Sequence, residues 1–206
     1  MKPPFLSLCL IVRNEASNLP RCIESLRHYA DEILIGDTGS IDDTPKIAAS
    51  LGASVHNIPW QNDFSAARNA LLKHAKGRYI LFPDADMFLA PQSTQALHDL
   101  LNHLRSLPPD HPHPPAFRLL VNDLEPSGNH GMSYLFLRLF PNLPSIRFRW
   151  PVHEQIEESI QEINLPIHNT NITLLHTGYM SQPQKLEKQK RNLSILYKIL
   201  AQPSPP

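Results

Sequence analysis

The first half of the chain alternates short apolar runs with segments in which apolar residues recur at helical spacing. The apolar runs have the length of strands and cover Phe5–Val12, Glu32–Gly36, Ala53–Ile58 and Tyr79–Phe82. The segments that follow them predict helices over residues 16–29, 44–51, 63–75 and 91–105. A continuous apolar run such as the first is typical of a parallel strand that is covered on both faces. Strands that alternate with helices therefore predict a mainly parallel sheet built by right-handed crossovers.

Two of the predicted helices begin with capping signals. Thr44 stands directly before Pro45, and this pair predicts a capping threonine followed by proline as the first helical residue. Asp63 is predicted to cap the next helix, which Gly77 closes.

The second half changes character at a proline-rich segment. Residues 107–115 predict a stiff surface loop, because proline fits neither a helix interior nor a central strand. Short strands are predicted after this loop over Ala116–Val121, Met132–Phe140, Gln155–Ile160 and Asn171–His176. A final helix is predicted over 182–200, with four leucines on its apolar side: Leu186, Leu193, Leu196 and Leu200. The tail, residues 202–206, is expected to be disordered.

The composition narrows the class of partner. The chain has 206 residues, which fits one large domain or two small ones, and its 19 basic and 19 acidic side chains give a formal net charge of zero. Nucleic acids and anionic membrane surfaces both attract a basic excess. Nucleic acid is therefore not expected as a partner, whereas peripheral association with a membrane stays open.

The cysteines and the first apolar run bear on location. Cys9 and Cys22 fall within a predicted strand and a predicted helix, where they are typical of buried thiols in a reduced compartment rather than of a disulfide framework. Phe5–Val12 is eight residues long, which is too short to span a bilayer. We therefore expect a cytoplasmic protein without a transmembrane segment.

Asp84 and Asp86 directly follow the predicted strand Tyr79–Phe82. In an open α/β sheet, ligands bind outside the carboxyl ends of the strands. Two carboxylates at such a place can hold a hard divalent ion, and Mg²⁺ typically takes one or two protein carboxylates together with water and phosphate oxygens. The alternative interpretation is an acidic turn that caps the next helix.

Two further clusters are candidates for ligand binding. Asp37 and Gly39 follow the second predicted strand, where a carboxylate can accept hydrogen bonds from a base or a ribose; the alternative is an Asx turn with Gly39 at positive φ. Arg68 lies in the first turns of the helix that Asp63 begins. Its guanidinium could bind a pyrophosphate through two hydrogen bonds, and the alternative is a surface arginine.

In their order along the chain, these motifs resemble the family 2 glycosyltransferases. Besides the clusters above, the resemblance rests on Leu8–Asn14 with Glu15, Asp31-Glu32-Ile33, Asp37-Thr38-Gly39-Ser40, Trp60, Asp63-Phe64-Ser65-x-x-Arg68-Asn69 and Gly77. The branch that looks most similar carries Asp-Thr-Gly-Ser and Asp-Phe-Ser-x-x-Arg-Asn motifs. It includes bacterial enzymes often followed by tetratricopeptide repeats, and peptide S-glycosyltransferases. The resemblance is dense over residues 5–90 and thin over residues 134–200.

The resemblance implies a fold, a donor and a cofactor. The fold is an α/β fold of the GT-A type, with a Rossmann-like, mainly parallel sheet, helices on both faces and a smaller mixed-strand acceptor half. Residues 1–106 would bind a nucleotide-diphosphate sugar, expected to be a UDP-sugar, and residues 116–201 would complete the acceptor and metal sites. The implied cofactor is Mg²⁺ or Mn²⁺. The acceptor stays unknown and could be a glycan, a lipid or a peptide.

The resemblance also implies roles for single residues. Asp86 and His176 would hold the metal ion, Asp84 would lie near the sugar, and Glu154 would be the base that an inverting enzyme needs. The residues implied at the nucleotide sugar are Val12, Asn14, Glu15, Asp37, Gly39, Ser40, Arg68, Asp84, Lys185 and Arg191.

Several positions depart from the pattern of that branch, and alternatives remain. The departures are Gly36, Ile41, Asp43, Arg78 and Met87, none of which removes a predicted ligand. For Glu154 the alternative is a surface residue paired with Arg147 or Arg149, and for His176 it is a buried, hydrogen-bonded histidine.

Two other functions are weighed against sugar transfer. A non-catalytic domain that binds a nucleotide sugar would share the same motifs. A nucleotidyltransferase usually needs a glycine-rich basic loop after the first strand, whereas residues 13–17 contain no glycine.

Overall fold

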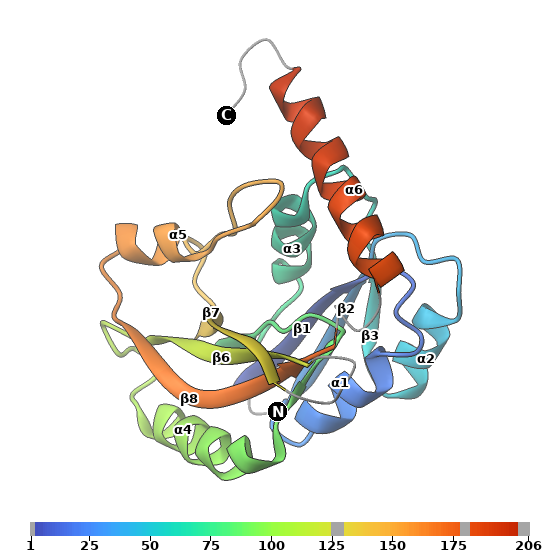
Figure 1. The fold of residues 1–206 in the computed structure, drawn as a ribbon. Helices are drawn as coiled ribbons and strands as arrows, with labels where there is room; N and C mark the ends of the chain where they lie inside the picture. The colour runs from blue at the N-terminus through green and yellow to red at the C-terminus, as the bar shows by residue number, and fades with distance from the viewer. Residues whose placement is uncertain (1–2, 125–129, 178–181, 202–206) are drawn as a thin grey trace.

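The apolar strand β1 (Leu6–Val12) lies at the centre of four parallel strands (Figure 1). β2 (Glu32–Asp37) and β4 (Tyr79–Leu81) flank it, and β3 (Ser54–Asn57) lies beyond β2. The four strands predicted in the first half, their parallel pairing and their order along the chain are confirmed. This computed structural model describes residues 3–124, 130–177 and 182–201.

The second half of the chain continues the same sheet. β7 (His130–Pro141) pairs antiparallel with β4 and with β6 (Ala116–Leu124), and β8 (Ile167–His176) runs parallel to β6. β5 (Met87–Leu89), which the sequence pattern did not predict, closes the edge beside β8. The strand order is therefore β3-β2-β1-β4-β7-β6-β8-β5, and the two halves of the chain meet where β4 pairs with β7 and where β8 pairs with β5.

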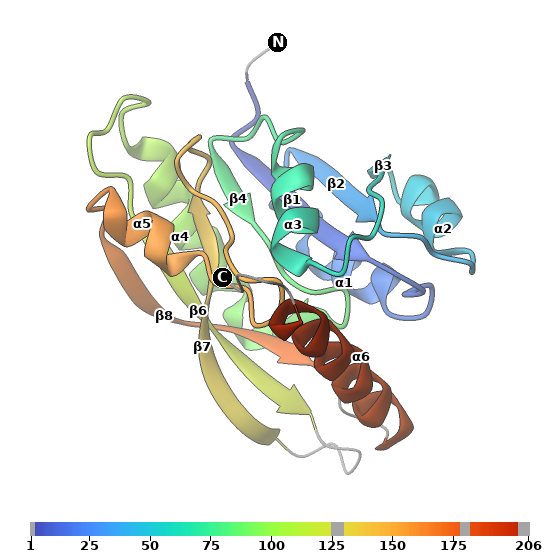
Figure 2. The same cartoon turned by 90° about the horizontal axis from the view of Figure 1, so that it is seen from above.

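Helices cover both faces of the sheet, as predicted (Figure 2). One face packs against α1 (Leu19–Leu26), α2 (Thr44–Ser50) and α4 (Thr94–Ser106), which follows the short 3₁₀ helix η1 (Pro91–Ser93). The other face packs against α3 (Phe64–Leu72) and α5 (Glu157–Glu162). The fold is thus an α/β fold with a layer of helices on each side.

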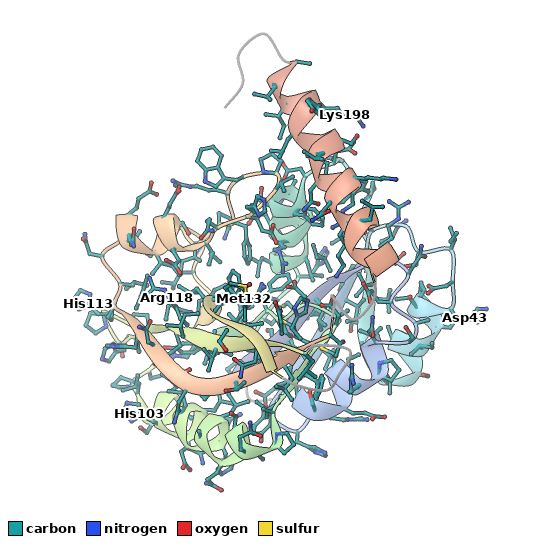
Figure 3. All side chains as sticks on the ribbon, in the orientation of Figure 1. Asp43, His103, His113, Arg118, Met132 and Lys198 are labelled. Carbon is teal, nitrogen blue, oxygen red and sulfur yellow. The ribbon has the colours of Figure 1, made fainter. Side chains whose placement is uncertain are left out.

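The proline-rich loop 107–115 contains neither a helix nor a strand, as predicted. Its His113 lies on the outside of the molecule, as does His103 on α4 (Figure 3). Both imidazoles are exposed to solvent. These two histidines therefore lie away from the candidate site described below.

The last helix, α6 (Gln182–Leu200), has the predicted bounds but a different packing. Its predicted apolar side is exposed, with Leu193 at 52% and Leu200 at 69%, whereas Ile195 is buried. Figure 1 shows the C-terminal part of α6 standing away from the sheet. In the described ranges, no helix has the length and apolarity that crossing a membrane requires.

Three local predictions are wrong. Gly77 does not close α3, which ends at Leu72 with Lys73 as its C-cap residue. Thr44 does not cap α2 but is its first residue; Asp42 accepts from the Thr44 backbone N–H (3.0 Å), and the Thr44 hydroxyl accepts from the backbone N–H of Glu15 (2.8 Å). The predicted strand Gln155–Ile160 is replaced by α5, because Ile156 and Ile160 are four residues apart and bury the same side of a helical turn. By contrast, Asp63 caps α3 as predicted, since its Oδ1 accepts from the backbone N–H of Ala66.

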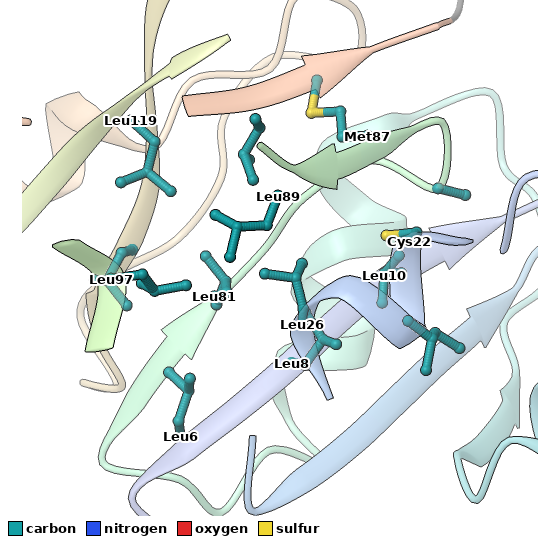
Figure 4. Packing of buried hydrophobic residues seen from close by; sticks show 14 of the residues in the cluster. Leu6, Leu8, Leu10, Cys22, Leu26, Leu81, Met87, Leu89, Leu97 and Leu119 are labelled. Atoms are coloured by element: carbon teal, nitrogen blue, oxygen red, sulfur yellow. The ribbon is translucent and has the colours of Figure 1, made fainter. Parts of the chain in front are cut away.

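The core follows from the alternation of side chains along β1. Leu6, Leu8 and Leu10 point to the face covered by α1 and α4, where Leu26 and Leu97 pack beside them (Figure 4). Cys9 points to the opposite face, toward α3. Because both faces of β1 are buried, its backbone is held rigidly, and the loop after Val12 starts from a fixed position.

Candidate active site

The carboxyl ends of β1 and β4 open onto a cavity of about 540 Å³. Residues from both halves of the chain line it, including the following predicted site residues: Val12, Glu15, Arg68, Asp84, Asp86, Glu154, His176 and Arg191. The location agrees with the rule that ligands bind outside the carboxyl ends of strands. The structure therefore brings most of the predicted site residues together, although their roles stay predictions.

Asp84 lies between two arginines. Its Oδ1 accepts a hydrogen bond from Nη2 of Arg68 at 2.6 Å, and its Oδ2 accepts one from Nη2 of Arg138 at 2.8 Å. Burial alone would raise the pKa of Asp84, but the guanidinium groups of Arg138 and Arg68 outweigh it and hold the pKa well below its usual range. Asp84 is therefore a charged carboxylate at neutral pH, with both oxygens fixed.

Arg68 is buried in α3 and reaches two carboxylates at once. Besides holding Asp84, its Nε donates to Oε1 of Glu154 at 2.9 Å. Its guanidinium packs 4.7 Å from the centre of the Phe82 ring. The alternative of a surface arginine is therefore wrong. Within the described ranges Nη1 has no hydrogen-bond partner, and a contact between Arg68 and a diphosphate stays a prediction.

Glu154 follows a stretch of backbone in which Trp150 (φ 74°) and His153 (φ 57°) adopt left-handed conformations. These turns direct the Glu154 side chain toward Arg68, and that side chain is 18% exposed. The alternative pairing with surface arginines is wrong, because Arg149 binds Glu162 and Arg147 donates to the backbone carbonyl of Ile146 instead. Glu154 is thus an anchored carboxylate in the wall of the cavity.

His176 connects Asp86 to Asp123. Its Nε2 lies 3.3 Å from Oδ2 of Asp86, and its Nδ1 lies 2.6 Å from Oδ1 of Asp123. The register of the sheet produces this arrangement, because His176 pairs with Met87 on β5 and with Asp123 on β6. Burial would lower the pKa of His176, but Asp86, and then Asp123, raise it above its usual value.

The atoms around Asp86 suit a divalent ion that a phosphate also ligates. A carboxylate oxygen and an imidazole nitrogen are ligands that Mn²⁺ accepts, and Asp123 orients the imidazole as outer-shell carboxylates do. The part of the chain that the structure describes contains no group of three or more metal-ligating side chains. The donor set therefore fits an ion that completes its shell with water and phosphate oxygens. Metal binding by Asp86 and His176 stays a prediction.

A hydrogen bond between Asn14 and Ser40 joins the loop after β1 to the loop after β2. The backbone N–H of Asn14 donates to Oγ of Ser40 at 2.9 Å, and Ser40 in turn donates to Asp37 at 2.5 Å. Gly39 has φ 104°, as the alternative interpretation of this segment, an Asx turn, requires. Asn14, Asp37, Gly39 and Ser40 are not among the residues that line the cavity. Their contacts with a nucleoside stay predictions.

Glu15 and three residues of α6, Lys188, Arg191 and Asn192, also line the cavity. Glu15 accepts from Nδ2 of Asn18 at 2.8 Å, and burial raises the pKa of Glu15. The guanidinium of Arg191 lies 4.8 Å from the centre of the Phe64 ring. The side chain of Lys185, predicted at the nucleotide sugar, lies outside the described residues.

Two residues that contact the site, Arg138 and Asp123, were not predicted from the sequence. Arg138 interrupts the apolar run of β7, and a charged residue at such a position was an available signal. Asp123 lies two residues beyond the predicted end of its strand, and only the pairing of β6 with β8 brings it to His176. Arg138 thus holds Asp84 in place, and Asp123 holds His176 in place.

Comparison with known proteins gives a family match and longer relatives. The model of the family described as Glycosyl transferase family 2 matches residues 7–124, which is more than half of the chain. A TPR repeat-containing protein of Synechococcus elongatus is 37% identical over 198 residues, which cover 91% of this chain and 47% of the relative. The SPbeta prophage-derived glycosyltransferase SunS of Bacillus subtilis is 25% identical and is covered to 45%. The chain thus spans about half the length of these relatives.

Solved structures share the fold. The structure of Staphylococcus aureus TarS (residues 1–349) in complex with UDP-GlcNAc superposes with a TM-score of 0.62 at 14% identity, over 97% of this chain and 68% of that one. Glucosyl-3-phosphoglycerate synthase of Mycobacterium tuberculosis, in complex with Mn²⁺, UDP and phosphoglyceric acid, gives a TM-score of 0.60 at 18% identity, over 98% and 80%. At such identities the likeness establishes the GT-A fold alone.

Proposed function

Because the chain belongs to the family 2 glycosyltransferases, we propose that it transfers a sugar from a nucleotide-diphosphate sugar to an acceptor, with inversion at the anomeric carbon. A UDP-sugar is the expected donor, which the UDP-GlcNAc bound to TarS and the UDP bound to the mycobacterial synthase support. The acceptor, whether a glycan, a lipid or a peptide, stays open. The cytoplasm is the expected location.

The proposal rests mainly on the placement of carboxylates around one cavity. Arg68 joins Glu154 to Asp84 within a single cavity, and Asp86 with His176 forms its adjacent wall. An inverting transfer needs a carboxylate that accepts the acceptor's proton on one side of the sugar and a stabilised leaving group on the other. The arrangement provides candidates for both.

The proposed reaction is a single displacement. The acceptor's nucleophilic atom attacks the anomeric carbon and passes its proton to Glu154. The bond from that carbon to the phosphate oxygen breaks, and the nucleoside diphosphate leaves with the bonding electrons. Arg68 holds Glu154 in place during this step, while Asp84, fixed by Arg68 and Arg138, is placed to contact the sugar.

Asp86 and His176 would hold Mg²⁺ or Mn²⁺, and the Mn²⁺ in the mycobacterial synthase supports this cofactor. Such an ion supplies positive charge to the diphosphate as negative charge develops on it. Asp123 keeps the His176 ring oriented. Arg191, which also lines the cavity, is placed to add positive charge toward the leaving group.

A screen of nucleotide sugars with Mn²⁺ by thermal unfolding tests the proposal first, because a ligand that binds the folded state raises the melting temperature. Release of UDP from the selected donor then separates the alternatives. A non-catalytic binding domain would be stabilised without releasing UDP. A nucleotidyltransferase would instead release pyrophosphate from a nucleoside triphosphate. Failure of every nucleotide sugar to stabilise the chain would contradict the proposal.

A further inference from the structure

The ammonium group of Lys188 occupies the cation position beside Asp86. Lys188 extends from α6 into the cavity, and its Nζ lies 2.8 Å from Oδ2 of Asp86. The same oxygen faces Nε2 of His176 at 3.3 Å. The Asp86 side chain is 8% exposed, so the lysine neutralises a carboxylate that little water reaches. The oxygen predicted to bind the metal ion is therefore already paired with a cation.

An ammonium group and a divalent ion compete for such an oxygen. Two cations a few ångströms apart repel each other strongly in a partly buried site. A metal ion that binds Asp86 must therefore displace Lys188 from it. The lysine has a flexible four-carbon stem, so its ammonium group can change partner without movement of the helix.

The rest of α6 supports such an exchange. Ile195 is buried, and Arg191 packs on Phe64, so two contacts other than Lys188 hold the helix against the body of the protein. A diphosphate ligated by the same metal ion would bring negative charge into the cavity that Lys188 lines. The displaced ammonium group would then be able to pair with the diphosphate.

We propose that Lys188 is an internal counter-ion that holds the cation position at Asp86 in the empty enzyme and passes to the diphosphate when metal ion and donor bind together. The proposal rests on the proposed function and goes beyond it. It makes Lys188 a competitor of the metal ion alone and a ligand of the complete donor. Binding of the metal ion and of the nucleotide then becomes mutually favourable.

Measurements of Mn²⁺ affinity can distinguish this exchange from a purely structural role of Lys188. Removing the ammonium group strengthens Mn²⁺ binding to the empty enzyme, because the competitor is gone. The same change reduces the gain in Mn²⁺ affinity that UDP brings, because a contact with the diphosphate is lost. A variant that merely loosens α6 would weaken binding under both conditions.

Electron paramagnetic resonance of Mn²⁺, titrated with the full chain with and without UDP, tests the proposal. We compare wild type with Lys188→Gln and Lys188→Met, and use Lys190→Gln as a control, since Lys190 is exposed on the same helix beside Leu193. Both Lys188 variants should bind Mn²⁺ alone about fivefold more tightly, the upper end of the scale for one ion pair near the surface. Saturating UDP should raise their Mn²⁺ affinity less than it raises that of wild type.

The possible outcomes separate this proposal from the proposed function. If the Lys188 variants bind Mn²⁺ alone no more tightly than wild type and Lys190→Gln do, the counter-ion role is overturned, while the proposed function stands. If wild type binds neither Mn²⁺ nor UDP, both are overturned.

Discussion

Nε of Arg68 donates a hydrogen bond to Oε1 of Glu154 at 2.9 Å, which joins α3 to the loop before α5 across 86 positions of the sequence. The same guanidinium holds Oδ1 of Asp84. The relative position of the two carboxylates is therefore set by one buried side chain. In the proposed reaction these carboxylates face the acceptor and the sugar, so Arg68 is a positioning residue.

Replacing Arg68 by lysine should slow sugar transfer by about 100-fold, the scale expected when reacting groups shift by about 1 Å. An ammonium group is a point charge and cannot reproduce the fork that binds two carboxylates. The measurement is the rate of UDP release at saturating donor. Arg149→Lys is the control, because Arg149 pairs with Glu162 at the surface. A wild-type rate in Arg68→Lys would contradict the positioning role.

Replacing Asp84 by asparagine should change how stability depends on pH. The pKa of Asp84 is held below its usual range, so the carboxylate contributes stability above about pH 4, and this contribution is lost as the pH falls toward the folded-state pKa. Asp84→Asn should therefore lower the free energy of unfolding by about 1–3 kcal/mol at pH 7. The difference between variant and wild type should shrink as the pH is lowered from 4. Urea unfolding at several pH values measures this difference, and a difference that does not vary with pH would contradict the ion pairing.

The sequence predicted the part of the molecule that local patterns determine. Because β1 is apolar throughout, its strand character and central position were predictable, and the turn after β4 placed Asp84 and Asp86 correctly at a strand end. The start of α3 was predictable for an equally local reason, because Asp63 caps it through the backbone N–H of Ala66, three residues later.

The missed features depend on contacts between distant segments. Arg138 reaches Asp84 only because β7 pairs with β4, and Asp123 reaches His176 only because β6 pairs with β8. No spacing within one segment reveals such a register. The exposure of Leu193 on α6 could not be predicted either, since its periodicity alone does not say which side of the helix packs.

Replacing Asp123 by asparagine should weaken Mn²⁺ binding about tenfold, as loss of an outer-shell carboxylate behind a ligating histidine does. Oδ1 of Asp123 lies 2.6 Å from Nδ1 of His176 and fixes the orientation of the ring. The measurement is Mn²⁺ titration in the presence of UDP. Asp99→Asn, at an exposed position on α4, serves as the control. Equal Mn²⁺ affinities in the two variants would show that His176 needs no support from Asp123.

Neither cysteine should react with thiol reagents in the folded protein. Cys9 and Cys22 are buried, and burial raises the pKa of both thiols, so the reactive thiolate is scarce at neutral pH. Titration with a chromogenic disulfide reagent should detect no rapid reaction in buffer and two thiols in urea. Rapid labelling in buffer would show that the core around β1 and α1 is open.

In the proposed reaction, Glu154 takes the acceptor's proton and a divalent ion is required. The most direct measurement is UDP release from the donor selected by thermal unfolding, with water as the acceptor of the sugar, in wild type and in Glu154→Gln, with Mn²⁺ and after chelation. Glutamine keeps an oxygen for Arg68 but is no base, so we expect at least about 100-fold slower release with unchanged donor affinity, and no release from wild type without metal. Wild-type release by Glu154→Gln, or release that survives chelation, would contradict it.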